Sequence, residues 1–339
     1  MNATILSENK KHFPVLLKEI ISIISPQYGG TFLDCTFGQG GYSKKILEFK
    51  NTKVIAVDRD KDTLKVAKDI EKKYPNRFKF FNKKFSEINQ IKLGDKLKCI
   101  IFDLGYSLNQ IKDNTKGLSF NSTGKLNMSM GLNTFSAHDV IHNLDLIDLH
   151  RVFKYFGEEK ESKIIAKKII TLRKKKNINN EDLIDIIESS KKKYFKKNKS
   201  TKIFQSIRMF VNNEISELMK GLVAASKLLE PGGMIIVVSF HSIEDRIVKF
   251  FFNDLSSGKN LSRYLPKNEH DKKIFKINKK KPILPSQREV EINPASRSAK
   301  LRFALKLRDI DDYEKKFNEK FKFLLDIENI SKKLWKKLY

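Results

Sequence analysis

Three glycines lie where an apolar, strand-like run gives way to a helical pattern. Gly38, Gly40 and Gly41 follow residues 31–34, and a residue without a side chain lets the backbone approach a cofactor closely. Asp58 lies about 20 positions after Gly38, at the end of the next apolar run, where a carboxylate can accept both hydroxyls of an adenosine ribose. These residues together predict a site for a nucleotide-containing cofactor.

A glycine loop of this kind suits more than one cofactor. A nicotinamide dinucleotide is one alternative, but residues 38–43 lack the third glycine of the G-x-G-x-x-G fingerprint. Asp58 alone could also be a turn residue at a strand end. Two segments, 102–107 and 228–233, lie where class I methyltransferases carry a substrate loop and a helix-to-strand turn. These two segments favour methyl transfer over hydride transfer. Methyl transfer from a sulfonium needs an in-line nucleophile and depends mainly on positioning.

The elements that must position these residues alternate between strand-like and helix-like patterns from residue 30 to residue 103. Short apolar runs that end in carboxylates alternate with helical segments, which predicts a parallel, doubly wound α/β sheet. A ligand is then expected at the carboxyl ends of the strands. The predicted strands cover 31–34, 54–58, 78–81, 99–103, 234–240 and 299–307, and the first helices cover 42–49 and 61–73.

A helical pattern replaces the strand rhythm between about residues 112 and 211. Ser136 is a candidate N-cap, and 146–156 is a helical run. Apolar residues from Phe204 to Leu229, at three- and four-residue steps, predict one long helix that leads back to the sheet. We therefore expect a methyltransferase core in two parts (1–111 and 212–310), an inserted helical substrate-recognition domain (112–211) and a basic C-terminal helix (311–339). That helix either packs on the core or forms an RNA-binding arm.

The composition of the 339-residue chain favours a nucleic-acid partner. Its 68 basic and 40 acidic side chains give a net charge of +28, which attracts polyanions. The amino-acid usage of an AT-rich genome is an alternative cause of this lysine excess. Cys35 and Cys99 fit a reduced cytoplasm, because they suggest neither a disulfide framework nor a metal site. No apolar run reaches the roughly 18 residues that a membrane span needs.

Short motifs follow one another in a distinctive order along most of the chain. They lie at 12–17, 34–43, 58–60, 103–105, 117–120, 155–159, 204–208, 211–214, 239–246, 293–294 and 297–302. Through these motifs the chain resembles the RsmH (MraW) family, the 16S rRNA cytosine-N4 methyltransferases. The resemblance implies a Rossmann-like class I core that uses S-adenosyl-L-methionine. It also implies action on a cytidine in the decoding region of small-subunit rRNA, either as free rRNA or in the assembled subunit.

The resemblance also assigns roles to individual residues. The cofactor contacts of the family fall on Gly40, Gly41, Tyr42, Asp58, Phe85, Asp103 and Gln110. Phe85 can stack near the adenine, while Asp103 and Gln110 can hydrogen-bond to polar edges of the cofactor or base. We expect no metal and no membrane contact, and the sequence does not distinguish a monomer from a homodimer.

Four residues are candidates for catalysis. The cytosine amine needs an acceptor for its N–H as the methyl arrives, and either the Asp103 carboxylate or the Leu104 carbonyl can provide it. Tyr106 can stack on a base that has left its RNA context. Asn127 offers an amide to the base. His241 lies in a substrate-side loop or is a structural histidine, and the absence of a G-x-S-x-G motif argues against a nucleophilic triad.

Basic residues in the family-like stretches are candidates for RNA contact. In residues 191–199, lysines flank two aromatic rings, which suits RNA binding or a solvated helix end. Three arginines are candidates for binding RNA phosphates: Arg208, Arg297 and Arg302.

Several substitutions separate this chain from the family pattern. The family usually has histidine where Tyr42 lies, and it has two carboxylates and a guanidinium that residues 126–131 have lost. The changes lie mainly on the substrate side, so three alternatives remain open. They are an active rRNA methyltransferase, which we favour, a weakly active or non-catalytic ribosome-assembly factor, and a nicotinamide-dependent oxidoreductase.

Overall fold

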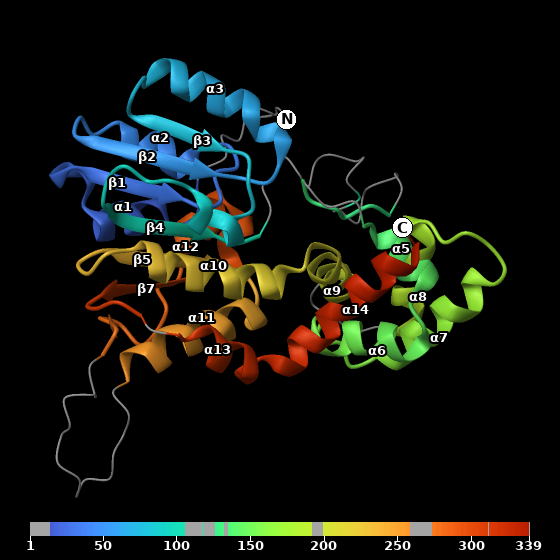
Figure 1. Cartoon of the computed structure of the whole chain (residues 1–339). Helices are drawn as coiled ribbons and strands as arrows, with labels where there is room; N and C mark the ends of the chain where they lie inside the picture. Colours follow the sequence, from blue (N-terminus) through green and yellow to red (C-terminus); the bar gives the residue numbers. More distant parts are fainter. Residues whose placement is uncertain are drawn as a thin grey trace, which may run out of the picture.

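A mixed sheet, with seven strands among the described residues, lies on one side of the computed structural model (Figure 1). The structure describes residues 14–105, 117, 126–131, 135–191, 199–257, 273–310 and 312–338. The strand order is β3-β2-β1-β4-β5-β7-β6; the first five pair in parallel, and β7 runs antiparallel to β5 and β6. The strands are β1 Gly30–Asp34, β2 Thr52–Val57, β3 Phe78–Phe81, β4 Leu97–Asp103, β5 Met234–Ser239, β6 Phe275–Lys276 and β7 Lys300–Lys306.

Both faces of the sheet are buried, as expected for parallel strands with apolar residues at successive positions. In β4, Cys99 and Ile101 join one apolar cluster, while Ile100 and Phe102 join the other, because successive side chains point to opposite faces. Helices α1, α2 and α3 pack on the first face, and α10 and α11 pack on the second. The core helices are α1 Leu17–Ile24, α2 Gly41–Leu47, α3 Leu64–Lys73, α10 Glu214–Leu228, α11 Ser242–Ser256 and α12 Gln287–Ile292; the 3₁₀ helices are η1 Pro26–Tyr28, η2 Lys61–Thr63, η3 Phe85–Gln90 and η5 Pro294–Ser298.

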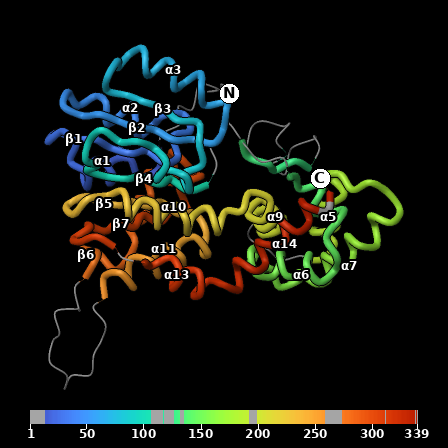
Figure 2. The backbone as a smooth tube through the Cα atoms, viewed as in Figure 1, coloured from blue at the N-terminus to red at the C-terminus, as the bar shows by residue number. Residues whose placement is uncertain are grey.

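A group of helices lies beside the sheet, between β4 and β5 in the chain (Figure 2). Ser136 caps the first of these helices as predicted, because its hydroxyl accepts the Asp139 N–H and Asp139 accepts the Ser136 N–H. Asp145 and Asn179 cap two later helices in a similar way. The helices are α5 Ala137–Asn143, α6 Leu146–Tyr155, α7 Ser162–Arg173, α8 Asn180–Ser190 and α9 Thr201–Asn212.

The prediction of one long helix over 204–229 was wrong, because the chain breaks between α9 and α10. Asn213 adopts the left-handed conformation with φ 52° and ends α9. Asparagine tolerates this conformation better than most residues. The apolar periodicity continues through the break, and therefore the pattern alone did not reveal it.

Two helices, α13 Glu314–Lys320 and α14 Lys322–Leu338, follow the last strand. Phe317 and Phe321 bury their rings under α11, while Ile327 and Leu334 bury the apolar side of α14. Of the two alternatives for this basic segment, the structure shows packing against the protein. Within the described ranges, no helix is both long and apolar enough to cross a membrane.

The close packing of α10 on η3 gives a test of the fold. A Cβ atom at Gly221 would lie 2.6 Å from Cδ2 of Phe85. Gly221→Ala should gain about 1 kcal/mol in helix propensity but lose about 3 kcal/mol by overpacking. We predict a net loss of about 2 kcal/mol in the free energy of unfolding, measured by denaturant titration. Gly94→Ala is the control, since no atom lies within 4 Å of its added Cβ; equal losses in both variants would contradict the packing.

Candidate cofactor and active site

Three carboxylates end neighbouring strands at one edge of the sheet. Asp34 ends β1, Asp103 ends β4, and Asp58 directly follows β2. The strand register brings Asp34 beside Ala56 of β2 and Ile101 of β4. Burial, with a smaller contribution from the charge of Asp58, raises the pKa of Asp34 to about 6, although hydrogen bonds from Ser43 and Thr36 lower it. The predicted carboxyl-end site therefore brings together acidic groups that repel one another.

Asp58 organises the glycine loop through its side chain. Its Oδ2 accepts the Gly38 N–H at 2.7 Å, and its Oδ1 accepts the Asp60 N–H at 2.8 Å. Burial raises the pKa of Asp58, although these two hydrogen bonds act in the opposite direction. Because each carboxylate oxygen has a second lone pair, Asp58 can also accept ribose hydroxyls.

The three glycines of the loop are needed for different structural reasons. Cβ atoms at Gly40 would lie 2.8 Å from atoms of Phe37 and Ile70, and one at Gly41 would overlap Pro14. These two glycines therefore let the loop pack on the protein itself. At Gly38, with φ 52°, the nearest atom to an added Cβ is 3.9 Å away. Among the three, open space for close approach of a cofactor lies at Gly38.

Tyr42 connects the glycine loop to Asp103. Its buried hydroxyl lies 2.6 Å from the Val15 carbonyl oxygen and 3.2 Å from Asp103 Oδ2. One hydroxyl proton serves only one acceptor at a time. When Asp103 is ionised, Tyr42 can donate to it; when Asp103 is protonated, Tyr42 can donate to Val15 and accept from the carboxyl group. Tyr42 thus tolerates both states of Asp103.

Asp103 lies in surroundings that disfavour its charge. Its pKa is raised to about 8, mainly by burial and also by the charges of Asp34 and Glu244, while the hydrogen bond from Tyr42 lowers it. Asp103 Oδ1 is buried and has no hydrogen-bond partner among the described residues. An anion in such a place is stabilised by a cation. The site therefore fits a ligand with a positive charge beside Oδ1.

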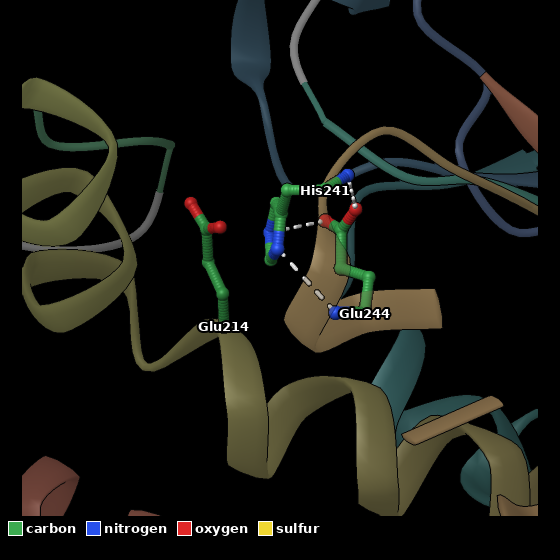
Figure 3. Close-up of side chains that lie close together, drawn as sticks. All are labelled: Glu214, His241 and Glu244. Atoms are coloured by element: carbon green, nitrogen blue, oxygen red, sulfur yellow. Dashed lines mark hydrogen bonds and ion pairs between the residues drawn. The ribbon is translucent and has the colours of Figure 1, made fainter. Parts of the chain in front are cut away.

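A second charged group lies where β5 leads into α11 (Figure 3). His241 Nδ1 accepts the Glu244 N–H at 3.3 Å, and its Nε2 lies 3.0 Å from Glu244 Oε1. Glu244 Oε2 also accepts the Phe240 N–H at 2.8 Å. Burial alone would raise the pKa of Glu244, but His241 and Arg208 hold it below its ordinary value. His241 therefore caps α11, which fits the structural alternative; its catalytic role remains a prediction.

Glu214 faces this histidine from α10. Its Oε2 accepts a hydrogen bond from Arg208 Nη2 at 2.9 Å, and its Oε1 lies 2.8 Å from Arg208 Nε in an ion pair. The ligand atoms of Glu214, His241 and Glu244 lie within 4.8 Å of one another. Each carboxylate already has a partner, Arg208 or His241. We therefore infer that these residues hold the ends of α9, α10 and α11 together.

Asn127 belongs to a segment, 126–131, that contacts Arg59, just after β2, and Asn212 of α9. Its Oδ1 accepts the Ser129 N–H at 3.4 Å. Asn212 of α9 holds the same segment, because its side chain accepts the Met130 N–H and donates to the Met128 carbonyl, both at 2.8 Å. Asn127 therefore lies in a fixed segment that connects the inserted helices with the sheet.

The other predicted residues divide into two groups. Phe85 lies in η3, where its ring meets Phe102 edge to face at 5.5 Å and packs against Gly221. Tyr106 and Gln110 lie outside the described residues, as do most of the 117–120 motif and residues 192–198. The structure thus brings Asp58, Asp103 and the glycine loop together, and it places Phe85 beside Phe102 of β4.

Three cations proposed for RNA contact are instead held in ion pairs. Arg208 pairs with Glu214, and Arg302 pairs with Asp245 at 2.7 Å. Lys191 pairs with Glu159, and both side chains are 3% exposed. Each of these cations balances a nearby carboxylate, and their contact with RNA phosphates stays a prediction. Arg297 is exposed.

Sequence reasoning missed the contributions of Asp34, Glu244 and Asn212. The run that ends at Asp34 gave a signal for its position but not for its burial. The spacing of His241 and Glu244 matches a capping box, a local signal that was available. Asn212 contacts a segment that is 82 to 84 positions away in the chain, and local sequence carries no sign of that contact.

The sheet and its carboxyl-end site define an S-adenosylmethionine-dependent methyltransferase with a Rossmann-like core. The MraW methylase family matches residues 9–307, so the chain belongs to that family. It is 43% identical over 303 residues to the ribosomal RNA small subunit methyltransferase H of Ehrlichia canis, covering 87% of this chain and 100% of that protein. The proteins of the same name from Wolbachia sp. subsp. Drosophila simulans (42% over 300 residues; 86% and 97% covered) and Orientia tsutsugamushi (40% over 311 residues; 89% and 100% covered) are also similar.

The contact between Tyr42 and Asp103 gives a test of the site. Binding of S-adenosylmethionine should strengthen as the pH rises through about 8, because Asp103 then becomes an anion. Tyr42→Phe removes a hydrogen bond that lowers the Asp103 pKa, so the midpoint should move to higher pH and binding at pH 7 should weaken. Calorimetric titration at several pH values measures both effects. Tyr28→Phe is the control, since Tyr28 is 81% exposed; an unchanged midpoint in Tyr42→Phe would refute the coupling.

Proposed function

We propose that this protein methylates the N4 amine of a cytidine in the decoding region of small-subunit (16S) rRNA. The observation that carries this proposal is the buried Asp103 carboxylate, which ends β4 with Oδ1 lacking a hydrogen-bond partner among the described residues. Family membership supports methyl transfer, and the names of the relatives support ribosomal RNA as the substrate. Because ribosomal RNA is the substrate, we expect the activity in the cytoplasm.

The residues at the sheet edge fit S-adenosylmethionine, which supplies an electrophilic methyl group on a sulfonium. Asp58 would hold the ribose hydroxyls through its remaining lone pairs. Open space at Gly38 admits the cofactor beside the loop. The unpartnered Asp103 Oδ1 offers negative charge to a cationic part of the cofactor. Phe85 lies beside β4 and remains a candidate for contact with the adenine.

Asp103 also suits the proton chemistry of an amine acceptor. The lone pair of the cytosine amine is delocalised into the ring, so an acceptor at its N–H assists attack on the methyl carbon. The ionised Asp103 carboxylate accepts that N–H and takes the proton that the amine loses. Tyr42 supports this change, because its hydroxyl can donate to the carboxylate before transfer and to Val15 afterwards. The Leu104 carbonyl remains the alternative acceptor.

The surface of the inserted helices suits a polyanionic substrate. On and after α7, Lys163, Lys167, Lys174 and Lys175 are exposed. Exposed lysines bind phosphates without reading the sequence of the RNA. We therefore assign orientation of the RNA to the inserted helices, and selection of the base to the sheet edge and segment 126–131.

A non-catalytic ribosome-assembly factor is the second candidate. Segment 126–131 keeps its anchoring to Asn212 but carries Asn127, whose amide bonds to Ser129 within the same segment. RNA binding would then persist without methyl transfer. This candidate predicts the same rRNA affinity but no methylated product.

Nucleoside mass spectrometry distinguishes the two candidates. Small-subunit rRNA from a strain that lacks this protein should lose N4-methylcytidine at one position, and the purified protein with S-adenosylmethionine should restore it. Asp103→Asn keeps the side-chain shape but removes the charge, so we expect a loss of methyl transfer of about 100-fold or more. Asp95→Asn, a change at an exposed position, is the matched control. Unchanged N4-methylcytidine in the deletion strain would rule out the proposed activity.

A further inference from the structure

The two C-terminal helices lie beyond the part of the chain that the family match covers. The match ends at residue 307, just after β7, whereas α13 and α14 extend from Glu314 to Leu338. The Ehrlichia canis relative is aligned over its whole length and still covers 87% of this chain. The family match therefore does not reach α13 or α14.

Helix α13 attaches this extension to the sheet layer. Phe317 stacks on Phe250 of α11 with ring centroids 6.2 Å apart, and Phe321 meets the same ring edge to face at 5.5 Å. Lys316 forms an ion pair with Asp254 of α11 at 2.6 Å. The first part of the extension therefore has a fixed position relative to the core.

Helix α14 continues from there to the inserted helices (Figure 1). Phe323 meets Tyr155 of α6 edge to face, with centroids 4.6 Å apart. Ser331 Oγ lies 2.8 Å from Asn213 Oδ1, at the break between α9 and α10. The extension thus contacts the core at one end and the inserted helices at the other.

Glu328 makes the central contact of α14. Its two carboxylate oxygens accept the N–H groups of Ile215 and Ser216, at 2.9 Å and 3.0 Å. These groups belong to the first turn of α10, where backbone N–H groups lack partners within the helix. Glu328 is 2% exposed, and burial raises its pKa to about 7. A buried acid from the extension therefore caps a helix of the methyltransferase core.

The capped junction leads directly to the site. Asn212, which precedes Asn213, holds Met128 and Met130 of segment 126–131. On the other side of Asn213, Glu214 holds Arg208 and faces His241. Movement of the junction would shift the substrate-side segment. Arg59, next to Asp58, also contacts Asn212 and Met130, but the Asp58 carboxylate bonds to Gly38 and Asp60 instead.

We propose that Glu328 is a positioning residue, through which the C-terminal extension fixes the α9–α10 junction and thereby segment 126–131 for methyl transfer. The proposal rests on the proposed function. It requires that loss of the cap affect turnover of the RNA substrate much more than binding of the cofactor.

Glu328→Gln tests the proposal in the full-length protein. The NH2 group of the glutamine would face one of the two backbone N–H groups that the carboxylate accepts, so two donors would meet there. Hydrogen exchange followed by mass spectrometry should become faster by about tenfold in peptides over 126–131 and 213–218, with no change in β1. The kcat for rRNA should fall by about tenfold, while the Kd for S-adenosylmethionine changes less than twofold. Glu319→Gln, an exposed acid on α13, is the matched control and should leave all three quantities unchanged.

Two results would overturn the positioning role. One is unchanged exchange in 126–131 with unchanged kcat. The other is equal weakening of cofactor binding and turnover, which indicates general destabilisation. Ser331→Ala is the second variant, for use if Glu328→Gln does not fold, and should change the same peptides to a smaller extent. If the wild-type protein transfers no methyl group, the proposed function fails, and the exchange data still decide whether Glu328 fixes segment 126–131.

Discussion

The burial of Asp103 without a cation beside it is the constraint on which the site depends. The groups that shift its pKa are a tyrosine and two acids, Tyr42, Asp34 and Glu244. A cationic ligand stabilises the ionised form of Asp103, and proton uptake neutralises Asp103 in the absence of a ligand. The parallel sheet creates the arrangement, because neighbouring strands that run in one direction deliver their terminal carboxylates to one edge.

Hydrogen bonds around Asp103 fix the position of that edge of the sheet. The Asp103 N–H donates to Thr36 Oγ1 at 2.7 Å, which ties β4 to the loop after β1. Asp58 ties the same loop to β2 through Gly38. On the substrate side, Glu244 fixes the turn after β5 by accepting the Phe240 N–H. The carboxylates of Asp58 and Glu244 thus position backbone as well as carrying charge.

Local sequence patterns predicted much of this architecture. Apolar runs ending in Asp34, Asp58 and Asp103 predicted the central strands and the edge where a ligand binds, because strand direction and burial are encoded within a few residues. The break at Asn213 and the short β6 had no such signal, since one residue interrupts an otherwise continuous helical pattern and two residues carry no periodicity. The partners of Arg208 and Arg302 were also missed, because charge balance depends on contacts made in space.

A crystal structure with S-adenosylmethionine bound would test the role of Asp103. We expect the ribose hydroxyls to lie within hydrogen-bond distance of Asp58, and a positively charged part of the cofactor to lie beside Asp103 Oδ1. The bonds from Gly38 and Asp60 to Asp58 should persist. A cofactor bound away from the carboxyl ends of β1, β2 and β4, or an Asp103 Oδ1 that still lacks a cationic partner, would contradict that role.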